Sequence, residues 1–540
     1  MNSTITDPLG CGEALMQLLA DYGVDTVFGM PGTQTLELYR GIARAGIRHV
    51  QCRNEQGASL MADGYARATG KPGVCTLVTG PGVTNAATGI AQAYCDSQPM
   101  LVISGAGFTA SLGKGWGTVH ELDDQRAVTA SFTAFSAMVH RPDELPELVA
   151  RAFAVFRSSR PRPVHLSLPW DLVPQSAGAG WTVRRTPSRP QADPMAIAEA
   201  AELLAGATRP VLLLGGGAVG TGAHARGIAE RLGAVVLTSN AGKGILPESH
   251  PLSLGCSMLQ KPSQRALAEA DLVLLVGCQV AEGDHFLPHL DISGAIVRID
   301  IDPKELIAQY GAAVAIQSDA LPAMAALDRA LSLCAVTKPR AGGEAWAQDI
   351  RARNVASMTA QEQRHARVWQ MLRQALPANT LVMGDMSQLV YSGAFAFPVE
   401  QEQCWIYSGT YCALGVALPM AIGASIGAPH RAVVAVAGDG GLMFTVNELA
   451  TAVEERLALP VIVWNNDALQ EIAQQMDQRA IPRVGVEPRS PDFIKLAEAL
   501  GCHAVRAASA DHLAQALGAA LQADRPTLIE VREDSPWLAG

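Results

Sequence analysis

Residues 433–441 (VVAVAGDGG) and 461–466 (VIVWNN) decide the fold of this 540-residue chain. Each stretch is apolar on both faces, which is typical of a buried strand in a parallel sheet, and each ends in polar residues. Because the carboxyl ends of neighbouring parallel strands meet at one edge of a sheet, we expect Asp439 and Asn466 to lie together. Their side-chain oxygens and the backbone carbonyl of Ala468 would give a divalent cation three ligands. Mg²⁺ held in this way keeps positions for water and for two oxygens of a diphosphate.

Composition bounds the class of protein. The length corresponds to about three domains of about 150 residues, and 49% hydrophobic with 17% charged residues suits a well-buried α/β enzyme that forms oligomers. The net charge is −10 and there is no basic stripe, so a nucleic-acid partner is not expected. No apolar run reaches about 18 residues without a charge or a Gly or Pro break, so no membrane partner is expected. The absence of a leader pattern predicts a cytoplasmic protein, and ten cysteines without a CxxC motif are expected to be reduced thiols.

The chain divides into three successive α/β units, predicted at residues 1–180, 190–340 and 355–540. In each unit, short runs that are apolar on both faces alternate with helical patterns, which indicates a doubly wound parallel sheet. The first and third units look alike, and the middle unit is Rossmann-like. The expected strands include 26–28, 74–79, 100–104 and 164–168, then 211–214, 235–238, 272–276 and 296–301, and finally 380–383, 432–437, 461–464 and 527–531. One charged helix is expected around residues 345–374.

A run of three glycines, residues 215–217, follows the first strand of the middle unit. A nucleotide-binding turn needs spaced glycines and an acidic ribose ligand further along the chain, and neither is clear here. A tight strand-to-helix turn is therefore the favoured interpretation, with nucleotide binding as the alternative.

Three further motifs accompany the two polar strand ends: residues 53–67 (RNEQGASLMADGYAR), 80–85 (GPGVTN) and 414–419 (LGVALP). Together these motifs resemble the thiamine-diphosphate enzymes of the acetolactate synthase, pyruvate decarboxylase and benzoylformate decarboxylase group, over nearly all of the chain. The resemblance implies thiamine diphosphate and Mg²⁺ as cofactors, with Asp439, Asn466 and Ala468 as metal ligands. It also implies an N-terminal pyrimidine-binding domain and a C-terminal diphosphate-binding domain.

The same resemblance assigns roles to individual residues. Glu55 matches the glutamate that hydrogen-bonds pyrimidine N1′ of the cofactor and promotes proton removal at its reactive carbon. Leu414 matches the bulky apolar side chain that wedges between the two cofactor rings. Backbone N–H groups at the start of a helix that follows Gly440 and Gly441 would bind the diphosphate. The other cofactor contacts that the resemblance implies are Thr84, Asn85, Gln388 and Gly438.

The predicted acid and the predicted metal site lie in different units. In the family, the first domain of one chain faces the third domain of another, so the resemblance implies a homodimer at minimum and commonly a homotetramer. The middle domain holds a flavin or another nucleotide in some relatives and nothing in others, which leaves FAD open as a third cofactor.

The motifs are less specific about the substrate. Gln475 stands where acetolactate synthases carry a tryptophan, and the paired histidines of pyruvate decarboxylases are absent. Residues 111–125 (SLGKGWGTVHELDDQ) resemble instead the subgroup that acts on 5-guanidino-2-oxopentanoate, so decarboxylation of a 2-oxo acid to an aldehyde is the leading hypothesis. His120 is the candidate general acid or base, and Glu121 and Glu471 are candidate partners for a guanidinium group. An acetolactate synthase-type carboligase is the alternative, ahead of a non-catalytic cofactor sensor.

Overall fold

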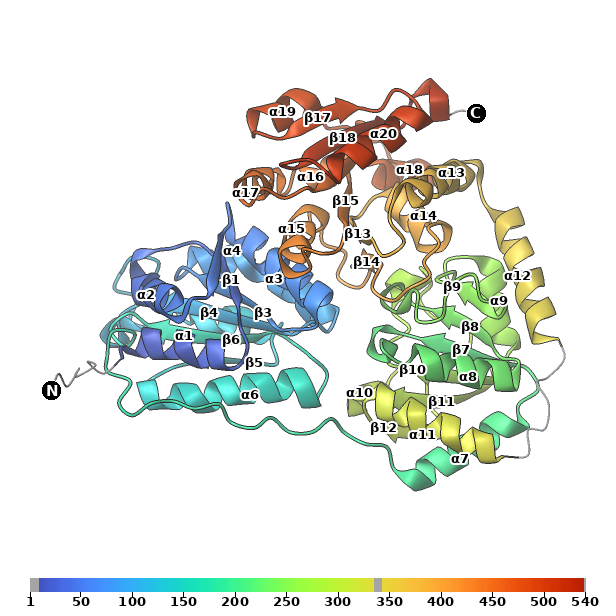
Figure 1. Ribbon diagram of the computed structural model, residues 1–540, viewed down its shortest axis with the longest axis horizontal. Coiled ribbons are helices and arrows are strands. Elements are labelled where there is room, and N and C mark those ends of the chain that lie inside the picture. The colour runs from blue at the N-terminus through green and yellow to red at the C-terminus, as the bar shows by residue number, and fades with distance from the viewer. Residues whose placement is uncertain (1–8, 335–341, 539–540) are drawn as a thin grey trace.

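The computed structural model describes residues 9–334 and 342–538, and it shows three α/β domains, each built on a six-stranded parallel sheet (Figure 1). The predicted fold class is therefore confirmed. The domain boundaries at 1–180, 190–340 and 355–540 remain a proposal, and their outer residues 1, 340 and 540 lie outside the described residues.

The N-terminal domain alternates strands and helices from the start. Its strands β3, β4 and β6 are buried along their whole length, as a sheet covered on both faces requires. The elements are α1 Cys11–Asp21, β1 Thr26–Gly29, α2 Leu36–Ala45, β2 Arg48–Gln51, α3 Glu55–Thr69, β3 Gly73–Leu77, α4 Pro81–Cys95, β4 Met100–Ala106, α5 Gln125–Ala130, β5 Phe135–Met138, α6 Leu145–Ser158 and β6 Val164–Pro169.

The middle domain lies below the third domain in Figure 1 and beside the first. Its central strands β7, β8 and β10 are again buried throughout. The elements are α7 Pro194–Gly206, β7 Pro210–Leu214, α8 Gly222–Leu232, β8 Val235–Thr238, β9 Ser253–Gly255, α9 Lys261–Glu269, β10 Leu272–Val276, β11 Ala295–Asp300, α10 Pro303–Leu306, β12 Val314–Gln317, α11 Ala320–Leu333 and α12 Gly343–Ser357.

The C-terminal domain contains the two apolar runs that end in polar residues. Residues 433–438 and 461–465 lie in the buried neighbouring strands β15 and β16. The elements are α13 Ala360–Ala375, β13 Leu381–Gly384, α14 Gln388–Ala396, β14 Trp405–Tyr407, α15 Ala417–Gly427, β15 Val433–Gly438, α16 Asp439–Leu442, α17 Leu449–Glu454, β16 Pro460–Asn465, α18 Gln470–Gln478, α19 Phe493–Ala499, β17 His503–Arg506, α20 Ala510–Ala520 and β18 Thr527–Arg532.

The first and third sheets share one topology. The strand order is β2-β1-β3-β4-β6-β5 in the first sheet and β14-β13-β15-β16-β18-β17 in the third, which is the same order when each domain is counted from its own first strand. The middle sheet differs, with the order β12-β11-β10-β7-β8-β9. Ligands of doubly wound sheets bind where the strand order reverses, which in the third domain lies between β13 and β15.

The first and third domains share one hydrophobic core across a close crossing of α3 and α15. Two glycines make the approach: a Cβ at Gly64 would lie 2.0 Å from the carbonyl oxygen of Met420, and a Cβ at Gly423 would lie 1.9 Å from that of Met61. Any side chain at either glycine would therefore force the two helices apart.

The prediction of a single helix around residues 345–374 is wrong. The first helix, α12, ends at Ser357. A second helix, α13, starts just after Thr359, where Thr359 and Glu362 form a reciprocal capping box. As a result α12 packs on the middle domain and α13 on the third. Within residues 9–334 and 342–538, no helix is both long and apolar enough to cross a membrane, and all ten cysteines are free.

Candidate active site

The predicted metal ligands meet at one edge of the third sheet. Strands β15 and β16 pair in parallel with Gly438 opposite Trp464, so Asp439 and Asn466 follow adjacent strand ends. The Asp439 carboxylate is 4% exposed, accepts a hydrogen bond of 3.0 Å from the Ser490 hydroxyl, and is bonded by the backbone N–H of Asp467. Burial raises the pKa of Asp439 because it disfavours the ionised carboxylate. A bound cation would favour that ionised form and offset the effect of burial.

Asn466 is held in a fixed orientation beside Asp439. Its amide nitrogen donates to Glu533 Oε2 at 3.0 Å, and its amide oxygen accepts from the backbone N–H of Ala468 at 3.3 Å. The set has one carboxylate, one amide and one backbone carbonyl, all of them oxygen donors of the kind that Mg²⁺ prefers. A metal site built on three or more His, Cys, Asp or Glu side chains is absent from the described residues.

The turn at Ser387 contains a hydroxyl that is free to bind a ligand. It lies beside the metal edge, which is the sheet edge that carries Asp439, Asn466 and Ala468. The Ser387 hydroxyl is buried and has no hydrogen-bond partner in the described chain, and a Cβ at Gly438 would lie 3.2 Å from the Ser387 Cβ. An orphaned hydroxyl at the sheet's switch point fits a polar ligand such as a diphosphate. The sequence placed the start of the local helix after Gly440 and Gly441, whereas α16 begins at Asp439, so those two glycines lie inside it.

Asp385 organises the loop that carries Leu414. Its carboxylate is 1% exposed and accepts backbone N–H bonds from Met386 at 2.7 Å, Gly415 at 3.1 Å and Ala417 at 3.3 Å. Gly415 has φ +81°, a conformation that favours glycine. Leu414 itself is half-buried in the turn that precedes α15, and its role as the wedge stays a prediction. Burial raises the pKa of Asp385 to about 6.

The N-terminal half of the site centres on Glu55, the first residue of α3. Asn54 caps the helix through its side chain, which accepts the backbone N–H of Gln56 at 2.8 Å. The Glu55 carboxylate is 8% exposed and accepts from Asn85 Nδ2 at 3.1 Å. The structure thus brings Glu55 and Asn85 together. The Thr84 hydroxyl donates to the Pro81 carbonyl at 3.1 Å, and its contact with the cofactor stays a prediction.

His120 and Glu55 both lie beside the turn formed by residues 80–82. A Cβ at Gly80 would come within 2.4 Å of the His120 carbonyl oxygen, and a Cβ at Gly82 within 3.2 Å of Glu55 Oε1. The sequence did not single out Gln125, whose side-chain oxygen accepts the Gly80 N–H at 2.7 Å while its nitrogen donates to Ser104, Gly105 and Ser167. Its place as the last residue of the 111–125 motif is the one sequence signal that could have drawn attention to it. A cavity of about 640 Å³ lies beside His120.

The two candidate substrate acids have different surroundings. Glu121 accepts the backbone N–H groups of Trp116 at 3.3 Å and Thr118 at 2.9 Å, so its carboxylate closes its own loop. Glu471, on the first turn of α18 and three residues after Ala468, accepts from Gln388 Nε2 at 2.9 Å and Gln475 Nε2 at 3.0 Å. Gln388 also donates to Gln474 at 2.7 Å, so its amide is tied to α18; its predicted diphosphate contact remains a prediction.

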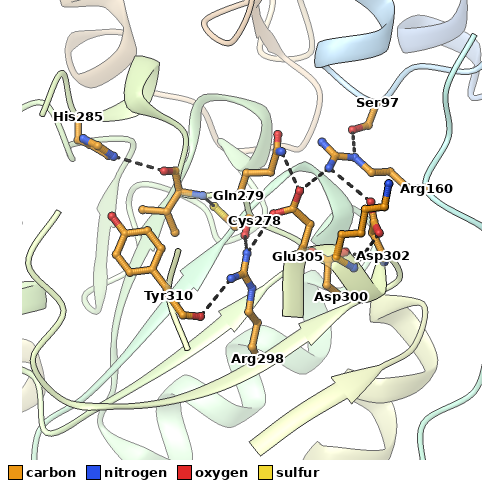
Figure 2. Close-up of polar contacts among 12 residues, drawn as sticks. Ser97, Arg160, Cys278, Gln279, His285, Arg298, Asp300, Asp302, Glu305 and Tyr310 are labelled. Atoms are coloured by element: carbon orange, nitrogen blue, oxygen red, sulfur yellow. Dashed lines mark hydrogen bonds and ion pairs between the residues drawn. The ribbon is translucent and has the colours of Figure 1, made fainter. Parts of the chain in front are cut away.

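The glycine turn of the middle domain is explained by packing. A Cβ at Gly215 would lie 2.2 Å from the carbonyl oxygen of Gly277, and a Cβ at Gly217 would lie 2.9 Å from the Gly277 Cα, which supports a tight turn. A cavity of about 420 Å³ lies beside it, between the domains. Arg160 and Glu305 line this cavity and pair at 2.6 Å, and Glu305 also pairs with the buried Arg298 (Figure 2). These pairs leave neither arginine free for a nucleotide diphosphate.

The three domains match the three parts of one enzyme family. Residues 10–128 match the N-terminal TPP binding domain of thiamine pyrophosphate enzymes, residues 197–327 the central domain, and residues 385–531 the C-terminal TPP binding domain. The chain belongs to the thiamine pyrophosphate enzyme family.

Among its relatives, the probable 2-ketoarginine decarboxylase AruI of Pseudomonas aeruginosa is 47% identical, over 97% of this chain and 94% of the relative. The probable acetolactate synthase large subunit of Methanocaldococcus jannaschii is 30% identical, over 96% and 91% of the two chains. The acetolactate synthase isozyme 1 large subunit of Escherichia coli is also 30% identical, over 97% and 94%.

Replacing Asp439 with Ala is expected to weaken binding of magnesium and thiamine diphosphate by at least about 100-fold, because loss of a direct ligand exceeds the 10–100-fold cost of a lost supporting group. Isothermal titration calorimetry measures both dissociation constants. Asp477→Ala is the matched control, because that carboxylate is exposed, pairs with Arg483 at 2.6 Å and is not an expected ligand. Equal affinity in wild type and Asp439→Ala would contradict the metal assignment.

Asp385 should also make stability depend on pH. Its pKa is about 6 in the fold and ordinarily 3.8, so its contribution is fully present below pH 3.8 and is lost as pH rises through 6. The loss amounts to about 3 kcal/mol. Melting temperatures of the cofactor-free protein between pH 4 and 7 should fall less with rising pH in Asp385→Asn than in wild type. Parallel curves would exclude this titration.

Proposed function

We propose that this protein is a thiamine-diphosphate- and Mg²⁺-dependent decarboxylase of 5-guanidino-2-oxopentanoate (2-ketoarginine), releasing CO₂ and an aldehyde. The observation that carries the proposal is the 47% identity to the probable 2-ketoarginine decarboxylase over 97% of the chain, against 30% to the acetolactate synthases described above. The guanidinium-compatible carboxylate of Glu471 beside the metal edge supports the same substrate.

The chain's own residues divide the work between two half-sites. Thiamine diphosphate, when bound, supplies the carbon that adds to the substrate ketone and takes up the electron pair left by CO₂. Asp439, Asn466 and Ala468 would hold Mg²⁺, and Leu414 would pack against the rings of the cofactor. Glu55 holds a proton at pyrimidine N1′, with Asn85 keeping its carboxylate in place. His120 serves as the general acid or base for the substrate.

A second copy of the chain completes the site. No hydrogen bond among the described residues joins Glu55 to the metal edge; its described partner is Asn85 of the same domain. Large apolar side chains are exposed in both half-sites. Near His120 these are Phe108, Trp116 and Val119, and near the metal edge Met443, Phe444 and Ile472. Burying such patches against a partner drives association. We therefore propose a homodimer at minimum, and a homotetramer as the full assembly.

Glu471 is the better candidate for the guanidinium partner. A guanidinium binds a carboxylate through two parallel N–H···O bonds, which requires both oxygens. Glu121 uses its carboxylate to hold two backbone N–H groups of its own loop. The partners of Glu471 are the neutral side chains of Gln388 and Gln475, which can rotate aside without leaving a charge unpaired.

A panel of 2-oxo acids tests the proposed reaction through CO₂ release. We expect the highest kcat/KM for 5-guanidino-2-oxopentanoate. The uncharged 5-ureido isostere should be lower by about 100-fold, because it leaves the carboxylate without its charged partner. Rapid joining of two pyruvates without release of an aldehyde would transfer the assignment to the acetolactate synthase-type carboligase.

Replacing Glu471 with Gln should raise KM for the guanidino acid by about 30-fold or more, since a charge-assisted bond of 2–3 kcal/mol is lost. The ureido isostere should change by less than about threefold. Asp477→Asn is the control on the same helix, because its carboxylate is exposed and pairs with Arg483. An equal rise in KM for the two substrates would show that Glu471 does not bind the guanidinium charge.

The acetolactate synthase-type carboligase remains the second candidate, favoured by the 30% relatives. It would agree with FAD in the middle domain, for which the glycine turn and the paired arginines offer no specific support. A visible absorption band in the purified protein would favour FAD. The cytoplasmic location expected from the sequence remains a prediction.

A further inference from the structure

A carboxylate of the third domain accepts hydrogen bonds from the backbone just before the helix that carries Glu55. Glu448 ends the 3-10 helix η7, Val446–Glu448, and its side chain is completely buried. Its Oε1 accepts the backbone N–H of Asn54 at 3.0 Å, and both of its oxygens lie 3.1 Å from the backbone nitrogen of Arg53. The hydroxyl of Thr451 donates to its Oε2 at 2.6 Å.

The neighbouring sequence leaves room for this carboxylate. Gly57 lies on the first turn of α3, and a Cβ there would come within 2.2 Å of Glu448 Oε1. The contact between Glu448 and the start of α3 therefore requires glycine at position 57, because a side chain there would displace the carboxylate. The N–H groups that precede a helix need partners when they are covered, and here the other domain supplies them.

The segment that ends in Glu448 begins at the metal edge. It runs from Asp439 through α16 and is fixed halfway by the Thr445 hydroxyl, which donates to the Gly415 carbonyl at 2.7 Å. Residues 439–448 therefore carry a predicted metal ligand, Asp439, at one end and the carboxylate that binds the start of α3, Glu448, at the other. Burial raises the pKa of Glu448, and the hydrogen bonds from Thr451, Arg53 and Asn54 act in the opposite direction.

We infer that Glu448 is a positioning residue for Glu55: it fixes where α3 begins and so aims the Glu55 carboxylate at the pyrimidine of the cofactor. The inference rests on the proposed function, because it needs Glu55 to act on the cofactor. Glu448 touches neither the substrate nor the cofactor in this assignment. Its effect on the reaction passes through Glu55 alone.

The test is a double-mutant cycle with Glu448→Ala and Glu448→Gln in wild-type and Glu55→Gln backgrounds. The readout is hydrogen–deuterium exchange at the thiazolium C2–H of the magnesium holoenzyme, followed by quenched-flow NMR. We expect Glu55→Gln to slow exchange by about 100-fold or more, and Glu448→Ala to slow it by about 10–100-fold, as small misplacements of catalytic groups do. Glu448→Gln keeps one accepting oxygen and should lose less.

Dependence on Glu55 separates positioning from general damage to the fold. If Glu448 acts through Glu55, Glu448→Ala should have no further effect on exchange in the Glu55→Gln background. Affinity for magnesium and thiamine diphosphate, measured by calorimetry, should stay within about threefold of wild type. Arg48→Ala is the control, because it removes an ion pair with Glu455 across the same domain boundary without touching α3, and its exchange rate should match wild type.

The outcomes are distinguishable. Unchanged exchange in Glu55→Gln would refute the proposed role of Glu55 itself. Slow exchange in Glu55→Gln together with wild-type exchange in both Glu448 variants would overturn the positioning role, as would an equal slowing by Glu448→Ala in both backgrounds. Should Glu448→Ala fail to fold, the nearly isosteric Glu448→Gln carries the same comparison.

Discussion

The close crossing of α3 and α15 is the constraint on which the rest of the structure depends. The helices cross through Gly64 and Gly423, where each backbone lies against the other helix with no side chain between. Helix α3 begins with Glu55, and α15 begins three residues after Leu414. The contact that joins the first and third domains therefore also sets the relative positions of the predicted acid, Glu55, and the predicted wedge, Leu414, within one chain.

Around this crossing, buried acceptor groups shape the backbone. Asp385 accepts three N–H groups and holds the turn before α15, Glu448 accepts two and holds the start of α3, and Gln125 accepts one and holds the Gly80 turn. A buried carboxylate costs free energy unless hydrogen bonds offset it. Three turns next to the predicted cofactor contacts are therefore fixed before any ligand arrives, and preorganised groups of this kind are what catalysis requires.

The fold was predictable because its signals are local. Apolar runs such as 433–438 could only be buried parallel strands, and the polar residues after them marked the sheet edge. The helix break at Thr359 was missed because a charged segment has no strong apolar period. Asp385 and Glu448 were not foreseen because most of their partners are distant backbone N–H groups. Two of the three groups that bind Asp385 lie 30 and 32 residues away, and the N–H of Asn54 lies 394 residues from Glu448. A side chain that binds distant backbone leaves no spacing pattern in the sequence.

The substrate side chain poses a different physical problem from the cofactor. The predicted cation ligands Asp439, Asn466 and Ala468 are short polar side chains and one backbone carbonyl. Glu471 instead has only neutral amide partners, and none of the described residues forms an ion pair with it. A half-buried carboxylate without a cation is incompletely stabilised. A cationic substrate would complete the pair, whereas a neutral 2-oxo acid would cover the carboxylate and leave it unpaired. Selectivity then comes mainly from the penalty on neutral substrates, which is the larger of the two effects in a site built to bind a charge.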